Sequence, residues 1–257
     1  MRAMPQKYAL HALCAALLAL LPLLLSGQVF VQPEPYGGNQ GVKDFLEAEM
    51  RFPETALAEE AKGTSVLIFT VKRDGTLQDL RIWQSFRPDC DAEALRLGAL
   101  VRWHPGTLGG IPADAEHYLR VPFNAKKYAK ARERDPGCPR ITAPDLASGT
   151  ALYDVNKLDT TAVPEVPGGM MGLPAYFQRE MRYPEDARRN DIQGPLKLEF
   201  VVEASGVVSN AVALKDLGGG CTEEAIRMVR AICWKPGIKD GRRVRTVVPV
   251  EILFRLP

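Results

Sequence analysis

Met50-Arg51-Phe52-Pro53-Glu54 is repeated 131 residues later as Met181-Arg182-Tyr183-Pro184-Glu185. The same offset holds in both directions without a gap, so that Pro33–Gly110 aligns with Pro164–Gly241 and roughly a third of the aligned residues are identical. A period above one hundred residues exceeds that of solenoid repeats, which reach about 50 residues. The sequence therefore predicts two tandem domains, each large enough for a small hydrophobic core of its own.

The first 27 residues are predicted to precede the folded domains. Arg2 and Lys7 come before an apolar run from Tyr8 to Leu25, and the small residues Ser26 and Gly27 follow it. This order is typical of a cleaved export signal, which we favour over a retained membrane anchor because the run is at the lower length limit for a membrane span. Both interpretations place the rest of the chain outside the cytoplasm. Membrane contact is expected only through residues 8–25, if they are retained.

The charge balance argues against nucleic acid as a partner. The chain has 33 basic and 31 acidic residues, and the first 27 residues hold two of the basic ones and none of the acidic ones, which leaves 31 minus 31, or zero, for the remainder. Nucleic-acid binding depends on neutralising phosphates with an excess of Lys and Arg. The one basic cluster is interpreted as a solvated loop rather than an anion site. It comprises Lys239, Arg242, Arg243 and Arg245.

Four cysteines remain after the N-terminal segment, and an exported protein can oxidise them. They are Cys90, Cys138, Cys221 and Cys233. The connectivity is left open, except that Cys221 and Cys233 bracket a predicted helix and would lie about 18 Å apart, too far for a bond. Cys90 and Cys221 occupy equivalent positions in the repeat and are interpreted as small buried residues rather than reactive thiols. No metal site is expected, because neither the cysteines nor the histidines have ligand spacing, and no cofactor is expected either.

The second repeat predicts the order helix, strand, strand, helix, strand. A short helix is predicted over Pro184–Asp191, followed by an alternating strand from Leu196 to Glu203 and a turn at Ser205-Gly206. The next strand, Val207–Lys215, breaks strict alternation and predicts a bulge. Thr222 is expected to cap a helix that ends at Ile232, before a core tryptophan, Trp234. A closing strand is predicted over Val244–Leu256. The predicted fold class is α+β, with each α-β-β-α-β domain forming a small antiparallel sheet backed by two helices.

This order of residues resembles the C-terminal domain of the TonB family. The likeness covers both repeats and is most specific in the second, where Tyr183-Pro184, Gly194, Gly206, Trp234 and the final Ile252–Leu256 strand are in place. The resemblance implies a periplasmic module that captures a short extended segment of an outer-membrane receptor. In the full transducer it also implies pulling on that segment with inner-membrane energy. A soluble periplasmic adaptor or scaffold without energy transduction is the alternative.

The closing strand is the predicted binding site. Pro249 lacks an N–H group and is tolerated only at a sheet edge or a bulge, so this strand is expected at an edge. An incoming extended peptide can pair with an unpaired edge by strand addition. In the family the matching strand serves as this platform, which assigns the peptide contacts to five residues. These are Val250, Glu251, Ile252, Leu253 and Phe254.

The first repeat is expected to have lost this platform. An alignment of Pro122 with Pro249 places Lys126 and Lys127 on the edge, where lysines discourage pairing. The prediction is that only the second repeat binds a receptor segment and that the first is degenerate and serves as a spacer or scaffold. Its sheet has an apolar second face at Val66 and Ile68, which is expected to be covered by the second repeat or the linker.

The predicted organisation is residues 28–125 as the first domain, 126–163 as a linker that starts with a charged helical stretch, and 164–257 as the second domain. Strand exchange at exposed edges makes a homodimer an open alternative. An enzyme is not expected. A Cys/His hydrolase built on Cys90 and His104 is the rival hypothesis, but His104 corresponds to Lys235 in the second repeat, as expected of variable surface rather than of a general base.

Overall fold

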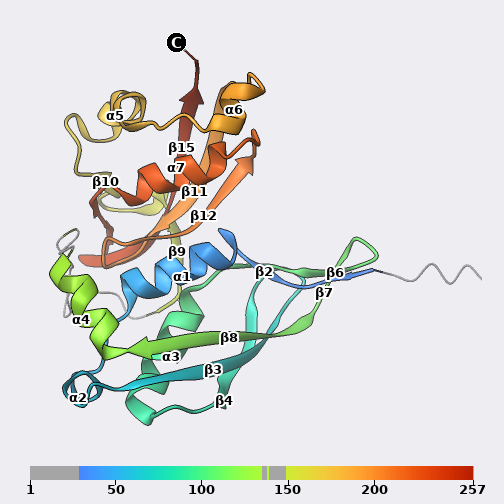
Figure 1. Ribbon diagram of the computed structural model, residues 1–257, viewed down its shortest axis with the longest axis vertical. Helices are drawn as coiled ribbons and strands as arrows, with labels where there is room; N and C mark the ends of the chain where they lie inside the picture. The colour runs from blue at the N-terminus through green and yellow to red at the C-terminus, as the bar shows by residue number, and fades with distance from the viewer. Residues whose placement is uncertain (1–28, 135–137, 139–148, 257) are drawn as a thin grey trace, which may run out of the picture.

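Two units of similar build lie one above the other in Figure 1. This computed structural model describes residues 29–134, 138 and 149–256, so the predicted export signal lies outside the described residues. We call residues 29–134 the N-terminal unit and residues 149–256 the C-terminal unit.

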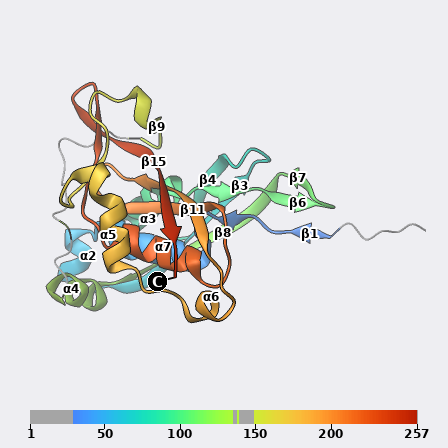
Figure 2. The same cartoon turned by 90° about the horizontal axis from the view of Figure 1, so that it is seen from above.

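The sheet of the N-terminal unit has the strand order β4-β3-β8, with antiparallel pairing throughout. Its strands are β3 (Lys62–Val71), β4 (Leu77–Gln84) and β8 (Ala115–Asn124). Its helices are α1 (Gly38–Glu49), α2 (Glu54–Ala58), α3 (Pro88–Leu100) and α4 (Ala125–Arg134). A small pair joins β2 (Glu34–Pro35) to β5 (Trp103–His104). A three-stranded arm projects from the unit in Figures 1 and 2, made of β1 (Phe30–Val31), β6 (Gly106–Leu108) and β7 (Ile111–Ala113).

The C-terminal unit repeats this arrangement with the strand order β12-β11-β15. Its main strands are β11 (Gly194–Val202), β12 (Val208–Lys215) and β15 (Arg242–Phe254). Its helices are α5 (Leu173–Glu180), α6 (Glu185–Arg189) and α7 (Cys221–Arg230), with short 3₁₀ turns at Val155–Lys157 (η1) and Gly169–Gly172 (η2). Short strands complete it: β9 (Leu152–Asp154), β10 (Val163–Pro164), β13 (Trp234–Lys235) and β14 (Gly237–Lys239).

The observed elements confirm the predicted fold class and add one helix to each unit. The predicted helices correspond to α6 and α7, and the predicted strands correspond to β11, β12 and β15. The first α-helix of each unit, α1 or α5, was not predicted. The proposed cap is wrong, because α7 begins at Cys221 after Gly220, and the Thr222 hydroxyl donates instead to Asp216 at 2.6 Å. Of the expected linker, the described residues form α4, β9, η1 and β10, which pack on the two units.

The repeated Met-Arg-aromatic-Pro-Glu stretch is held by the same carboxylate clamp in each unit. The Arg51 amide donates to Glu93 Oε1 at 2.7 Å, and the Arg182 amide donates to Glu224 Oε1 at 2.6 Å. Each clamp glutamate is mostly buried and pairs with an arginine one turn later in its helix, Arg96 or Arg227. That arginine also donates to the carbonyl that ends the first helix of the unit. A buried carboxylate needs such partners, and the clamp ties three helices together.

The predicted bulge is confirmed and occurs in both units. The pairing of β11 with β12 shifts between Glu199 and Val201, and β3 with β4 shifts at the equivalent place. Asn210 and its counterpart Asp79 adopt positive φ angles of 49° and 58° at this bulge. Asn and Asp are the non-glycine residues that tolerate this conformation best.

Each unit has its own apolar core, in which the equivalent tryptophans Trp103 and Trp234 are 3% and 4% exposed. The prediction that Trp234 belongs to the core is therefore confirmed. Val66 and Ile68 on the second face of the N-terminal sheet are also buried. Tyr118 is the cross-strand partner of Ile68 and packs edge-to-face with Trp83, so aromatic side chains of this unit lie over that face.

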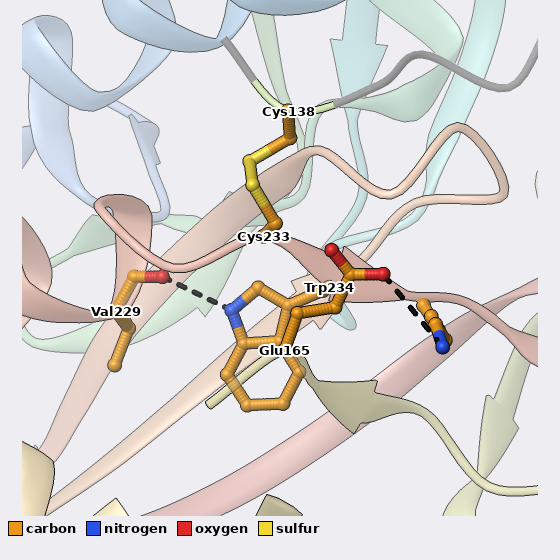
Figure 3. Close-up of a disulfide and its surroundings, with 6 residues drawn as sticks. Cys138, Glu165, Val229, Cys233 and Trp234 are labelled. Atoms are coloured by element: carbon orange, nitrogen blue, oxygen red, sulfur yellow. Dashed lines mark hydrogen bonds and ion pairs between the residues drawn. A yellow bond between two sulfur atoms is a disulfide. The ribbon is translucent and has the colours of Figure 1, made fainter. Parts of the chain in front are cut away.

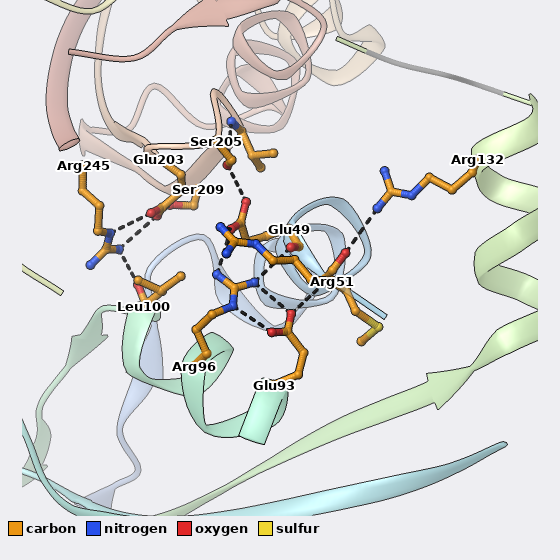
Figure 4. A network of polar contacts seen from close by, with 12 residues as sticks. Glu49, Arg51, Glu93, Arg96, Leu100, Arg132, Glu203, Ser205, Ser209 and Arg245 are labelled. Carbon is orange, nitrogen blue, oxygen red and sulfur yellow. Dashed lines mark hydrogen bonds and ion pairs between the residues drawn. The ribbon is translucent and has the colours of Figure 1, made fainter. Parts of the chain in front are cut away.

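The units are joined by a buried polar interface (Figure 4). The Leu100 carbonyl at the end of α3 accepts hydrogen bonds from Arg245 Nη2 at 2.7 Å and Asn210 Nδ2 at 3.1 Å. Arg245 is 5% exposed and also pairs with Glu203 at 2.7 Å. The assignment of Arg245 to a solvated loop is thus wrong. Local sequence placed it beside other basic residues, but the carbonyl that it binds belongs to the other unit.

Candidate peptide-binding edges

All five residues predicted to bind peptide lie in β15, at the end of the C-terminal sheet. One side of this strand pairs with β11 from Thr246 to Phe254. On β15, β9 pairs only with residues 245–247 and β14 only with residues 242–244. Among the described residues, no strand pairs with the outer edge of β15 beyond Val247.

The side chains of β15 alternate between core and solvent. Ile252 and Phe254 are buried at 1% and 0% exposure, whereas Glu251 and Leu253 are exposed. Alternation of this kind is expected for a strand with one covered face. Of the five predicted contact residues, only Glu251 and Leu253 are exposed, while Ile252 and Phe254 anchor the strand.

The backbone pairing shows which residues direct their amides and carbonyls outward. The Ala125 amide donates to the Ala61 carbonyl at 3.0 Å, in line with the β3–β8 register, so the odd-numbered residues of β8 bond to β3. In an antiparallel ladder the backbone amides and carbonyls of the alternate residues then point away from the partner strand. In β8 these residues include Arg120 and Pro122. The repeat offset of 131 assigns the outward positions of β15 to Pro249, Glu251 and Leu253. Pro249 therefore removes no hydrogen bond between β15 and β11, because an N–H at this position would point away from β11.

A shallow depression adjoins the C-terminal end of the β15 edge. It has a volume of about 390 Å³ and is lined by Gln178, Met181, Leu253, Arg255 and Leu256. The exposed fraction of the Leu253 side chain is 52%. An extended chain that pairs with the edge would pass this depression, which offers room for an apolar side chain next to Leu253.

The alignment that removed the platform from the N-terminal unit is wrong. Gly63 pairs with Phe123 and Gly194 pairs with Phe254, so the offset of 131 continues through the closing strands. The counterparts of Val250–Phe254 are therefore residues 119–123, and the counterpart of Leu253 is Pro122. Lys126 and Lys127 lie in α4, beyond the strand, where the Asn124 side chain accepts from the Lys127 amide. The N-terminal unit thus keeps a complete ten-residue closing strand, β8.

The edge of β8 is also unpaired on one side among the described residues, because β8 pairs only with β3. Unlike the β15 edge, it borders a groove at the junction of the units, with a volume of about 1430 Å³. Residues 117–120 and 122–124 of β8 line this groove, together with residues from α1, α4 and the C-terminal unit. Sequence reasoning missed this site, because its walls come from segments far apart in the chain.

The cysteines divide into one disulfide and two buried thiols among the described residues. Cys138 is bonded to Cys233, which immediately precedes Trp234 (Figure 3). Cys90 and Cys221 are free and fully buried, as predicted for small core residues. Burial raises the pKa of the Cys90 thiol to about 11, which disfavours the thiolate that a nucleophile needs.

The two described histidines lie in aromatic surroundings. His104 stacks on Tyr36 with ring centroids 4.1 Å apart, and His117 contacts Trp103 at 4.8 Å. Burial lowers the pKa of His117. These contacts suit packing more than proton transfer, and neither histidine forms a hydrogen bond to Cys90 among the described residues.

No helix among residues 29–134 and 149–256 is both long enough and apolar enough to span a membrane.

Comparison with known proteins gives a match to a family model and a match to a solved structure. The family model described as Gram-negative bacterial TonB protein C-terminal matches twice, at residues 48–125 and 179–256. No curated protein matches the chain. A solution structure of the Helicobacter pylori TonB C-terminal domain, residues 179–285, is 16% identical, with 33% of this chain and 78% of that chain covered and a TM-score of 0.25.

Proposed function

Because this chain belongs to the family of Gram-negative bacterial TonB protein C-terminal domains, we propose that it is a periplasmic protein that takes part in energy-dependent outer-membrane transport by binding a receptor. Its ligand is an extended segment of a TonB-dependent outer-membrane receptor, added as a strand to the edge of β15. The proposal assigns the contacts to Val250, Glu251, Ile252, Leu253 and Phe254, and it assigns the protein no catalytic activity.

The unpaired outer edge of β15 carries this proposal. Beyond Val247 the strand has β11 on one side and no strand on the other among the described residues. The Glu251 and Leu253 amides face that edge and lack a ladder partner. Strand addition satisfies such groups with main-chain hydrogen bonds, and the side chains at alternate positions then select the sequence. The depression beside Leu253 supplies one place for such selection.

A second candidate is an adaptor that binds receptor segments without energy transduction. The observation that favours it is the start of the fold: β1 begins at Phe30, only a few residues after the apolar run that ends at Leu25. A retained anchor would hold the units close to the inner membrane, with no spacer to reach the outer membrane. The mass of the mature N-terminus in the native host separates the two candidates.

The test of receptor capture is a proline substitution at the edge. Peptides from the periplasmic N-terminal segments of the host's outer-membrane receptors are titrated against the chain from residue 28 onward. Leu253→Pro removes one outward N–H, and its ring obstructs the edge, so we expect binding to weaken about tenfold or more. The Leu253→Pro variant should still fold, because proline already occupies the equivalent position of β8, Pro122.

Leu253→Val is the matched control, since it keeps the N–H and an apolar side chain and should bind nearly as the parent does. Equal binding by Leu253→Pro and the parent would refute strand addition at β15. Equal weakening of peptide binding by Leu253→Val and Leu253→Pro would assign recognition to the Leu253 side chain rather than to the backbone.

A further inference from the structure

The groove along the β8 edge has walls from both units. Val42 and Leu46 of α1 lie at its base, and the turn from Ser205 to Val208 and the end of α7 come from the C-terminal unit. Tyr128 of α4 and the Cys138–Cys233 disulfide also border it. In Figure 1, α1 lies between the two units and α4 lies beside the end of β8. A single TonB-like domain would lack the wall that residues 205–208 and 230–233 of the C-terminal unit supply.

The lining of the groove carries an excess of positive charge. Six basic side chains line it against two acidic ones, Asp44 and Glu47. Both acids are already paired, Asp44 with Arg230 at 2.6 Å and Glu47 with Lys127. The side chains of Lys43, Lys62 and Arg120 have no hydrogen-bond or ion-pair partner among the described residues. The Arg132 side chain donates to the Met50 carbonyl and lies over the Tyr128 ring at 4.7 Å, but it has no carboxylate partner among them. The groove therefore presents several uncompensated cations above an apolar base.

The size and shape of the groove favour an extended chain over a small molecule. Its volume of about 1430 Å³ exceeds the 300 to 1,000 Å³ typical of small-molecule sites. Its lining runs along β8 from His117 to Asn124, a length of about 26 Å at 3.3 Å per residue. The outward amides of Tyr118, Arg120 and Asn124 lie along this length and supply donors for a new strand.

The charge decides which extended chain fits. A second copy of this protein paired through β8 would bring Arg120 and its basic neighbours against the same residues of the partner, which costs free energy. An acidic segment would instead neutralise them. We propose that the groove between the units binds an acidic extended segment of a partner protein, added as a strand to β8. This site is separate from the β15 edge, so the chain would hold two segments of different chemistry at once.

The probe is a series of fluorescent eight-residue peptides with valine at every second position. The remaining positions are aspartate, serine or lysine, so strand propensity stays similar while charge changes from negative to positive. With the chain from residue 28 onward under oxidising conditions, we expect the aspartate peptide to bind at least tenfold more tightly than the lysine peptide, with affinity falling as salt rises. Lys43→Glu with Arg120→Glu should remove this preference, whereas Lys130→Glu, on α4 but outside the groove, should not.

A backbone variant tests the mode of binding. Tyr118→Pro removes an outward N–H at the position where β15 has Pro249, so the fold should tolerate it. The variant should bind the aspartate peptide about tenfold more weakly than Tyr118→Val does. Leu253→Pro should leave this peptide's binding unchanged, which separates the groove from the receptor site. The proposal is overturned if the aspartate peptide does not bind, or if Leu253→Pro abolishes its binding. It is also overturned if sedimentation shows a dimer that Tyr118→Pro dissociates and that the aspartate peptide does not.

Discussion

One ion pair occurs at the same place in both units, with its charges exchanged. Lys72 and Asp114 of the N-terminal unit correspond, at the offset of 131, to Glu203 and Arg245 of the C-terminal unit. The side chains of Lys72 and Asp114 are 34% and 29% exposed, whereas those of Arg245 and Glu203 are 6% and 2% exposed. The N-terminal pair borders solvent, while the C-terminal pair lies against the Leu100 carbonyl. The comparison shows how a repeated pair can become part of an interface when one copy is covered.

The largest expected effect comes from removing one partner of the buried pair. Arg245→Met leaves the Glu203 carboxylate buried without its ion pair and removes a donor from the Leu100 carbonyl, so we expect a loss of about 3 to 5 kcal/mol in the free energy of unfolding. Lys72→Met is the matched variant and should have a far smaller effect, because its pair is partly solvated. Urea denaturation measures both. Equal losses would mean that burial does not distinguish the two pairs.

The disulfide provides the next comparison, because Cys233 corresponds to Arg102. Arg102 lies over the Tyr36 ring at 4.4 Å and pairs with Glu199 across the units, so both positions tie distant segments together. Replacing Cys138 and Cys233 with serine should cost about 2 to 4 kcal/mol, since the bond closes a long loop with a sequence separation of 95. Reducing agent should destabilise the parent by the same amount and leave the double variant unchanged. A double variant as stable as the oxidised parent would contradict this.

The equivalent tryptophans predict a smaller difference. Trp234 Nε1 donates to the Val229 carbonyl at 3.0 Å (Figure 3), whereas Trp103 Nε1 is buried and has no hydrogen-bond partner within the described part of the chain. Replacement by phenylalanine removes similar apolar area in each unit. Trp234→Phe should therefore cost about 1 kcal/mol more than Trp103→Phe, measured by urea denaturation. The reverse order would show that the Trp103 indole has a partner in solution, such as bound water.

The smallest effect is a difference in pH dependence between the two ion pairs. The hydrogen bond from Lys72 lowers the pKa of Asp114, so its contribution to stability is present above about pH 4 and is lost as the pH falls through the lowered pKa. Burial raises the pKa of Glu203, although Arg245 offsets part of the rise. Its contribution is present below about pH 4.5 and is lost as the pH rises through the raised pKa.

Urea midpoints measured from pH 2.5 to 7 test this difference through their slopes. Asp114→Asn should flatten the acid limb below about pH 4, and Glu203→Gln should flatten the decline above about pH 4.5. Each variant also changes the absolute stability, which does not enter the comparison. Parallel slopes in both variants would mean that the two carboxyl groups titrate alike.

Sequence patterns predicted the elements around the repeated stretch because side-chain alternation and turn residues are local. The closing strands show where this fails. The proline alignment and the observed register differ by four residues, and a shift by an even number leaves the inward and outward positions of a strand unchanged. Periodicity therefore could not choose between them, and only the pairing of β8 with β3 does. The helix α1 was missed because its glycines, Gly38 and Gly41, weaken the helical signal.

The amino-acid sequence by itself determined that the chain is a tandem repeat, that each repeat has an alternating antiparallel sheet, and that Cys90, Cys221 and Trp234 belong to cores. These properties depend on residues close together in the chain or on the repeat itself. The tertiary structure alone decided the Cys138–Cys233 bond, the burial of Arg245 and the groove beside β8. Each of these joins segments many residues apart, and their proximity depends on how the two units pack against each other.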